Sequence, residues 1–111
     1  MNLIRPGRRV YYNLVDGVPV PCEMEDWFRN VDTRAAWRVA LDVRDGVEVS
    51  TVFLGLDHNF TGRGGPILFE TMIFGGPLDL WQDRYGTYAD AERGHVAACA
   101  LAFGEPEKAA R

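Results

Sequence analysis

The chain has 111 residues, a formal net charge of −4 and a composition of 47% hydrophobic, 12% aromatic and 25% charged residues. A chain of this length fits one domain, and this composition is globular rather than disordered. The excess of acidic side chains weighs against nucleic-acid binding as the main activity. We therefore predict a single domain over residues 1–111, with flexible tails at 1–8 and 105–111.

The N-terminal residues and the cysteines bear on where the protein works. The first residues contain no apolar run of signal-peptide length, and no stretch approaches the ~18 apolar residues of a membrane helix. We therefore expect a cytoplasmic protein that does not bind membranes. Its two cysteines, Cys22 and Cys99, are expected to be reduced and to act as small buried hydrophobic residues.

The first predicted element is a hairpin at residues 9–20, because strand-forming residues precede Asp16-Gly17, a dipeptide typical of a two-residue turn. Pro19 and Pro21 remove backbone donors from the returning arm, which predicts a short edge strand. A helix is expected next, at residues 23–30, with an acidic first turn that suits the helix dipole. We expect this helix to bury one side, formed by Met24, Trp27, Phe28 and Val31.

The middle of the chain predicts a second hairpin, with strands at 37–43 and 47–56 around the turn Asp45-Gly46. A two-residue turn would place Val39 opposite Val52 and give the hairpin two distinct faces. We expect the more apolar face to be the core: Trp37, Val39, Leu41, Val43, Val52 and Leu54. The other face mixes polar and apolar side chains: Arg38, Ala40, Asp42, Arg44, Val47, Val49, Thr51 and Phe53.

This mixed face is either partly covered by a helix or a candidate for contact between subunits. If the helices leave it uncovered, Val47, Val49 and Phe53 would form an apolar surface, which predicts a homodimer. On that hypothesis, Phe53→Glu converts the dimer to a monomer.

The remainder of the chain predicts a loop at 57–66, strands at 67–74 and 80–85, and a C-terminal helix. Thr87 and Asp90 form a capping pair at the start of this helix, and Gly104 ends it. The predicted fold is therefore α+β. It is a small antiparallel sheet of about five to six strands, covered by an N-proximal helix and a C-terminal helix.

Four residues are candidates for catalysis or metal binding: Asp57, His58, Glu70 and His95. Asp57-His58-Asn59 lies where a strand runs into a glycine-rich loop, and such loops often carry binding groups. Carboxylates and imidazoles serve both as metal ligands and as acid–base groups. No pair of these residues has the spacing of metal ligands, however. The alternative is that Asp57 and Asn59 organise the turn by capping backbone amides.

Glu70 and His95 are predicted to form a buried pair. Glu70 lies between apolar neighbours on its strand face, and a buried carboxylate requires a partner. The candidate partners are His95, Arg38 and Arg84. The Glu70–His95 pair would act either as a structural contact or as an acid–base catalyst.

The predicted ligand-binding residues are Asp57, His58, Asn59, Arg63, Trp81 and Tyr85. Arg63 lies in a Gly-Arg-Gly-Gly segment and could pair with an anion, although no helix follows to complete a phosphate site. Trp81 and Tyr85 could line a pocket, or could instead pack the last helix against the sheet. Covalent catalysis is not indicated, because no nucleophile lies beside a base in the sequence. We expect no metal and no cofactor.

Three segments carry a resemblance to a known group of proteins: VSTVFLGLDHNF at 49–60, LFETMIFGG at 68–76, and RYGTY at 84–88 leading to ERGH at 92–95. On these segments the chain resembles a family of small proteins encoded by tailed phages and prophages. The likeness extends from residue 16 to residue 95 and implies no catalytic residue. It implies a phage or prophage accessory protein that acts inside the bacterial cell.

The sequence therefore favours a non-catalytic intracellular binding protein, for a protein partner or a small ligand, and antagonism of host defence is one role of this kind. The alternative is a small metal-dependent or acid–base enzyme built on Asp57, His58, Glu70 and His95. The two hypotheses differ in whether these four side chains converge in one pocket.

Overall fold

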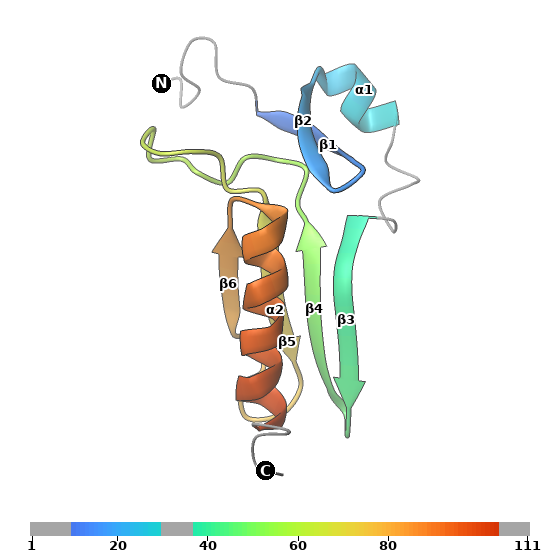
Figure 1. Ribbon diagram of the computed structural model, residues 1–111, viewed down its shortest axis with the longest axis vertical. Helices are drawn as coiled ribbons and strands as arrows, with labels where there is room; N and C mark the ends of the chain where they lie inside the picture. Colours follow the sequence, from blue (N-terminus) through green and yellow to red (C-terminus); the bar gives the residue numbers. More distant parts are fainter. Residues whose placement is uncertain (1–9, 30–36, 105–111) are drawn as a thin grey trace.

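The computed structural model describes residues 10–29 and 37–104, and in this part of the chain it has six strands and two helices (Figure 1). Their bounds are β1 (Tyr11–Val15), β2 (Val18–Cys22), α1 (Met24–Arg29), β3 (Arg38–Arg44), β4 (Val47–Phe53), β5 (Phe69–Phe74), β6 (Gln82–Tyr85) and α2 (Tyr88–Phe103). The predicted α+β class, with antiparallel strands and two helices, is confirmed. The predicted tails lie outside the described residues. Among those that are described, no helix has the length and apolar character needed to cross a bilayer.

The strands form two sheets rather than the single sheet expected. β1 and β2 pair with each other, while the larger sheet has the order β3-β4-β5-β6. The chain joins the two sheets just after β4, where Tyr11 bridges to Leu56 and the Tyr12 amide donates to the Gly55 carbonyl at 2.8 Å. Gly55 has a φ of 79°, which turns the chain there. The hairpin therefore sits at the end of the large sheet instead of extending it (Figure 1).

Helix α1 packs mainly on β1, and its Trp27 joins the core cluster that contains Phe53 and Phe69 of the large sheet. The expectation that its whole apolar side is buried is wrong. Trp27 is buried in that cluster, whereas Met24 and Phe28 are 50% and 56% exposed. Val31 lies outside the described residues.

Both predicted Asp-Gly turns are present, and all four turn residues have positive φ, from 49° to 82°. These are the backbone angles of the turn type that matches strand twist in a two-residue hairpin. The register in the second hairpin follows the prediction from Arg44↔Val47 to Ala40↔Thr51. Beyond that point the ladder shifts, and Arg38 rather than Val39 pairs with Val52. This bulge leaves Val39 packed against the core cluster that contains Phe53.

The predicted choice of core face for this hairpin holds at Trp37, which is buried, and is wrong farther along the strands. Val49 and Phe53, on the mixed face, are 0% and 3% exposed, while Val43 on the expected core face is 62% exposed. The cause is α2, which lies along the mixed face and covers it (Figure 1). Val49 and Phe53 are therefore unavailable as a subunit interface, and a homodimer through this face is not supported.

Helix α2 begins and ends where the sequence predicts. The Thr87 hydroxyl accepts a hydrogen bond from the Asp90 amide at 3.1 Å, and Gly104 ends the helix with a φ of 88°. The residues that it buries against the sheet are Ala91, His95 and Ala98. Gly94 allows a close approach, because a Cβ at this position would lie 2.2 Å from the Tyr85 ring. Small residues thus bring α2 close enough for polar side chains of the sheet to reach it.

Candidate functional site

At the predicted site, the side chains of Asp57 and Asn59 form hydrogen bonds with the backbone of their own loop. Asp57 is buried, and its Oδ1 accepts hydrogen bonds from the amides of Asn59 at 2.8 Å and Ile67 at 3.0 Å. The Asn59 side chain donates to the carbonyls of Arg63 and Gly65 at 2.6 Å each. The alternative prediction, that Asp57 and Asn59 organise the turn, is therefore confirmed.

His58 also bonds locally, because its Nδ1 lies 2.9 Å from the Leu56 carbonyl oxygen. Arg63 is exposed at the tip of the loop, where its carbonyl accepts from Asn59. The side chains of Asp57, His58 and Asn59 therefore hold the backbone of this loop in its conformation.

Glu70 and His95 do not meet, so the predicted pair is wrong. Glu70 bonds to Arg84, another of its candidate partners, with Oε2 3.0 Å from the Arg84 Nε. The neighbouring Thr71 points towards α2, and strand alternation places Glu70 on the opposite face of the sheet. Asp57, His58, Glu70 and His95 therefore do not converge.

Trp81 and Tyr85 belong to the packing between α2 and the sheet. Trp81 packs on the core cluster of Val49, Ile73 and Ala98, and Tyr85 packs on the cluster that contains Phe69 and Ala91. The Tyr85 hydroxyl is buried without a hydrogen-bond partner among the described residues. Burial raises the pKa of this phenol. Of the two predictions made for these aromatics, packing is the one that the structure bears out.

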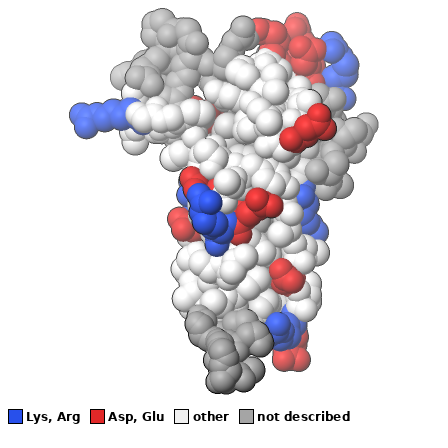
Figure 2. Space-filling view, viewed as in Figure 1, with Lys and Arg blue, Asp and Glu red and all other residues white. Residues whose placement is uncertain are grey.

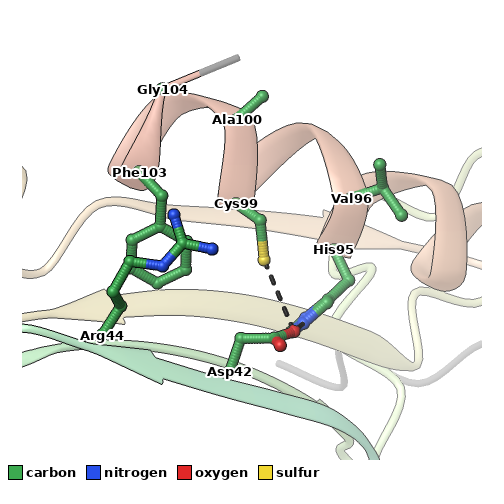
Figure 3. A pocket seen from close by; sticks show the side chains of 8 residues that line it. All are labelled: Asp42, Arg44, His95, Val96, Cys99, Ala100, Phe103 and Gly104. Carbon is green, nitrogen blue, oxygen red and sulfur yellow. Dashed lines mark hydrogen bonds and ion pairs between the residues drawn. The ribbon is translucent and has the colours of Figure 1, made fainter. Parts of the chain in front are cut away.

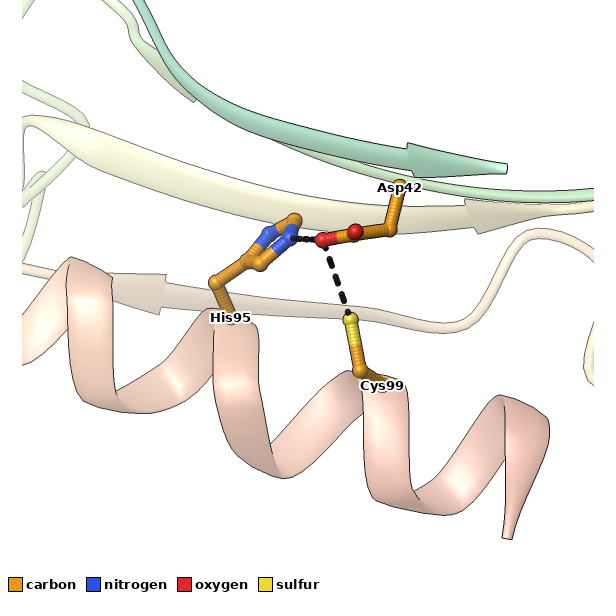
Figure 4. A group of neighbouring side chains, drawn as sticks. All are labelled: Asp42, His95 and Cys99. Atoms are coloured by element: carbon orange, nitrogen blue, oxygen red, sulfur yellow. Dashed lines mark hydrogen bonds and ion pairs between the residues drawn. The ribbon is translucent and has the colours of Figure 1, made fainter. Parts of the chain in front are cut away.

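A different polar cluster lies between α2 and the sheet, centred on His95. Its Nδ1 is 2.7 Å from the Thr51 hydroxyl, which is itself 2.5 Å from the Thr71 hydroxyl. On the other side of the ring, Nε2 is 2.7 Å from Oδ2 of Asp42 (Figure 4). The chain of hydrogen bonds thus runs from two fully buried hydroxyls, through a buried imidazole, to a carboxylate that is 59% exposed.

Cys99 completes the exposed end of this chain. Its Sγ lies 3.6 Å from Oδ2 of Asp42, on the same side of α2 as His95 (Figure 4). The hydrogen bond from His95 holds the pKa of Asp42 below its usual value. Burial, followed by the nearby Asp42 carboxylate, raises the pKa of the Cys99 thiol to about 11. The carboxylate is therefore ionised and the thiol protonated at neutral pH.

These groups open into a groove between α2 and β3, with a volume of about 310 Å³ (Figure 3). Its polar side chains are Asp42, Arg44, His95 and Cys99, and its apolar ones are Val96, Ala100 and Phe103. The guanidinium of Arg44 lies over the Phe103 ring, 4.6 Å from the ring centre. The groove therefore combines an anion, a cation and an apolar wall within one small space.

The Asp42–His95–Thr51 chain has the connectivity of a catalytic triad, in which a carboxylate and a hydroxyl flank an imidazole. Thr51, however, has no exposed surface, so a substrate cannot reach its oxygen. Both ring nitrogens of His95 are already within hydrogen-bond distance of protein groups. The described geometry thus offers a ligand polar contacts without an accessible nucleophile activated by His95.

The sequence contained part of this site. His95 and Cys99 are four residues apart on a predicted helix, a spacing that places both side chains on one face. Asp42 was placed correctly on the mixed face of the second hairpin. Strand alternation does not say which helix, if any, covers that face, so nothing in the pattern links Asp42 to α2.

Comparisons with protein-family models, curated proteins and solved structures find no match for this chain.

Proposed function

We propose that this chain is a non-catalytic binding protein whose ligand occupies the groove between α2 and β3. The observation that carries the proposal is the graded hydrogen-bond chain, which is buried at Thr71 and exposed at Asp42. A chain of this kind orients the exposed carboxylate towards the groove. A preformed cavity with a few convergent polar groups and an apolar wall is typical of ligand sites.

The groove indicates the chemistry of its ligand. Asp42 favours a hydrogen-bond donor or a cation, while Val96 and Phe103 favour an apolar group beside it. The volume of about 310 Å³ is at the small end for ligand pockets, which suits a compact molecule or one side chain of a partner. On the molecular face that carries α2, charged side chains gather in a group and much of the remaining surface is uncharged (Figure 2). Val96 and Leu101 are exposed on that helix. An amine with a small ring or branched alkyl group has the required features.

We propose no catalysis because a substrate cannot reach the Thr51 hydroxyl. A triad-like hydroxyl that is sealed under α2 stabilises the imidazole but cannot attack a substrate. An enzyme built on Asp57, His58, Glu70 and His95 is not proposed again, because these residues bond to separate partners.

The biological setting is proposed from the sequence resemblance alone. We propose a phage or prophage accessory protein that acts in the cytoplasm of the bacterial host. The groove is compatible with capture of a small molecule or of a side chain on a host protein, and antagonism of host defence is one outcome of such capture.

The thiol of Cys99 allows a direct test. The protein is incubated with a library of disulfide fragments under partly reducing conditions until thiol–disulfide exchange reaches equilibrium. A cysteine then retains the fragments that also bind non-covalently beside it. We expect selective capture at Cys99 of fragments that combine an amine with an apolar ring, and a loss of that selection in Asp42→Asn. Cys22, in β2, is the internal control. Capture at Cys99 that is no more selective than capture at Cys22 would contradict the proposal.

A further inference from the structure

We propose that Asp42, His95 and Cys99 bind one divalent transition-metal ion of the zinc class. This inference rests on the proposed function only in that the ion occupies the same groove. In the described part of the chain, these three residues are the one group of histidine, cysteine and acidic side chains placed to share a metal ion. Their ligand atoms all lie within 4.8 Å of one another.

The two elements that form the groove position these ligands independently of any ion. His95 and Cys99 are one helical turn apart on α2, and both side chains point towards β3 (Figure 4). Asp42 approaches them from β3, opposite Val49 in the ladder. Two ligands from one helix and a third from a facing strand are thus brought together by the packing of α2.

The distances from Asp42 to the other two ligand atoms fit a tetrahedral ion after a small adjustment. Bonds of roughly 2.0–2.3 Å place neighbouring ligand atoms about 3.3–3.6 Å apart. Cys99 Sγ and Asp42 Oδ2 are already 3.6 Å apart, whereas His95 Nε2 and Asp42 Oδ2 are at 2.7 Å. An ion therefore needs the carboxylate to retreat by roughly half an ångström. Asp42 is free to do this, because its side chain is exposed on an edge strand.

The surroundings of His95 match those of a metal ligand. A ligating histidine normally donates its second ring N–H to a fixed acceptor, which orients the ring and selects the nitrogen that binds the ion. Here Thr51 lies 2.7 Å from Nδ1, and it is buried and held in turn by Thr71. With an ion on Nε2, the ring donates from Nδ1 to Thr51, and Thr51 donates to Thr71.

The ligand types select the class of ion. A thiolate, an imidazole and a carboxylate together favour zinc, cobalt or nickel over magnesium or calcium, which prefer oxygen alone. Thiolate formation releases the Cys99 proton on binding, and the two anionic ligands neutralise the ion. Three protein ligands leave a fourth position on a tetrahedral ion, which could accept a donor atom from the groove ligand.

Cobalt(II) is the probe for this site, because its absorption spectrum reports geometry and thiolate ligation. We expect metal-free protein to bind one Co²⁺ per chain at micromolar concentration, with intense tetrahedral bands in the visible and a thiolate-to-cobalt band in the ultraviolet. Zn²⁺ should displace Co²⁺ and remove both. Cys99→Ser should lose the thiolate band, and Asp42→Asn should weaken binding at least tenfold. Thr51→Val, which leaves all three ligands in place, should weaken binding about 10- to 100-fold.

Cys22→Ser is the matched control and should keep the spectrum of the wild type. Melting temperatures show that each variant is folded before it is titrated. The proposal is overturned if wild-type protein binds no Co²⁺ below millimolar concentration, if the thiolate band survives Cys99→Ser, or if it disappears in Cys22→Ser.

Failure of the metal site and failure of the groove as a ligand site are distinguishable. Selective capture of fragments at Cys99 in protein that binds no Co²⁺ would remove the metal and leave the groove. Co²⁺ bound through Asp42, His95 and Cys99, without selective capture of fragments, would establish the metal and remove the amine-binding groove.

Discussion

The loop at residues 57–66 and the groove beside α2 both concentrate polar side chains, but they use them differently. In the loop, Asp57 and Asn59 bond to backbone groups two to ten positions away. In the groove, His95 bonds to Thr51 and Asp42, which are 44 and 53 positions away. The loop side chains thus bond to nearby backbone groups, whereas the hydrogen-bond chain of the groove leads to the exposed carboxylate of Asp42.

The difference shows why a polar cluster in a sequence is a poor guide to a site. Asp and Asn in a loop most readily satisfy nearby amides, and they then have little hydrogen-bonding capacity left for a ligand. Side chains assembled from separate elements are placed by packing, so they can face a common space. Within the groove there is also a gradient, since the buried end of the chain supports the fold and the exposed end is available to a ligand.

The largest expected effect comes from the buried imidazole. His95→Ala leaves a cavity and removes two hydrogen bonds, and we expect a loss of about 2–4 kcal/mol in the free energy of unfolding. The melting temperature should fall by roughly 10–20 °C. His58→Ala, the matched change in the loop, removes a single bond to a carbonyl and should cost less than about 1 kcal/mol. Thermal unfolding of both variants measures the two losses of stability. Equal losses would contradict the proposed difference between the buried end of the groove and the loop.

A smaller loss is expected in the loop itself. Asp57→Ala leaves the amides of Asn59 and Ile67 without their acceptor, which should cost about 2 kcal/mol. The same change at Asp83, an exposed residue that accepts from the adjacent amide of Arg84, should cost less than about 0.5 kcal/mol. Chemical denaturation gives both values. An Asp57→Ala variant as stable as Asp83→Ala would mean that the loop carboxylate is not structural.

The exposed end of the groove should contribute little to stability. Asp42→Asn keeps an acceptor for His95 and removes a charge that is mostly in solvent, so we expect a change of less than about 1 kcal/mol. Denaturation at neutral pH provides the measurement. A larger loss would make Asp42 a structural residue like Asp57 and weaken the contrast between the two regions.

The pH dependence of Cys99 alkylation gives the most local effect. Because its pKa is raised from 9.0 to about 11, the thiolate fraction at pH 8 is about one hundredth of the ordinary value. Labelling by iodoacetamide in metal-free protein should therefore be slow at pH 8 and still accelerate between pH 9 and 11. Asp42→Asn should speed it, because the neighbouring negative charge is gone. Fast labelling at pH 8 with no further rise would contradict the described surroundings of the thiol.

Much of the fold was predictable because its determinants are local. The Asp-Gly turns and the caps at Thr87 and Gly104 lie within a few residues of what they control. The covered face of the second hairpin was not predictable in this way, because alternation defines two faces but does not say which one a distant helix covers. The bulge near Val39 added a shift in register that no turn residue signals.

The candidate site was likewise predictable where its determinants are local and not where they depend on packing between distant elements. The four-residue spacing of His95 and Cys99 is visible in the sequence, and His95 was correctly predicted to be a buried, hydrogen-bonded residue. Its partner was not predictable, because Glu70 and Asp42 are both carboxylates on strands and only the position of α2 selects between them. Local preference thus determined the elements, and packing between elements determined the site.

The most direct test of the account measures Co²⁺ affinity in Asp42→Asn and Asp57→Asn, two variants that each replace one carboxylate with an amide of the same shape. The groove predicts at least tenfold weaker binding in Asp42→Asn. Asp57→Asn should bind as tightly as the wild type, because Asp57 accepts hydrogen bonds from amides of its own loop and does not line the groove. Weaker binding in Asp57→Asn with wild-type affinity in Asp42→Asn would contradict the account and return the site to the loop.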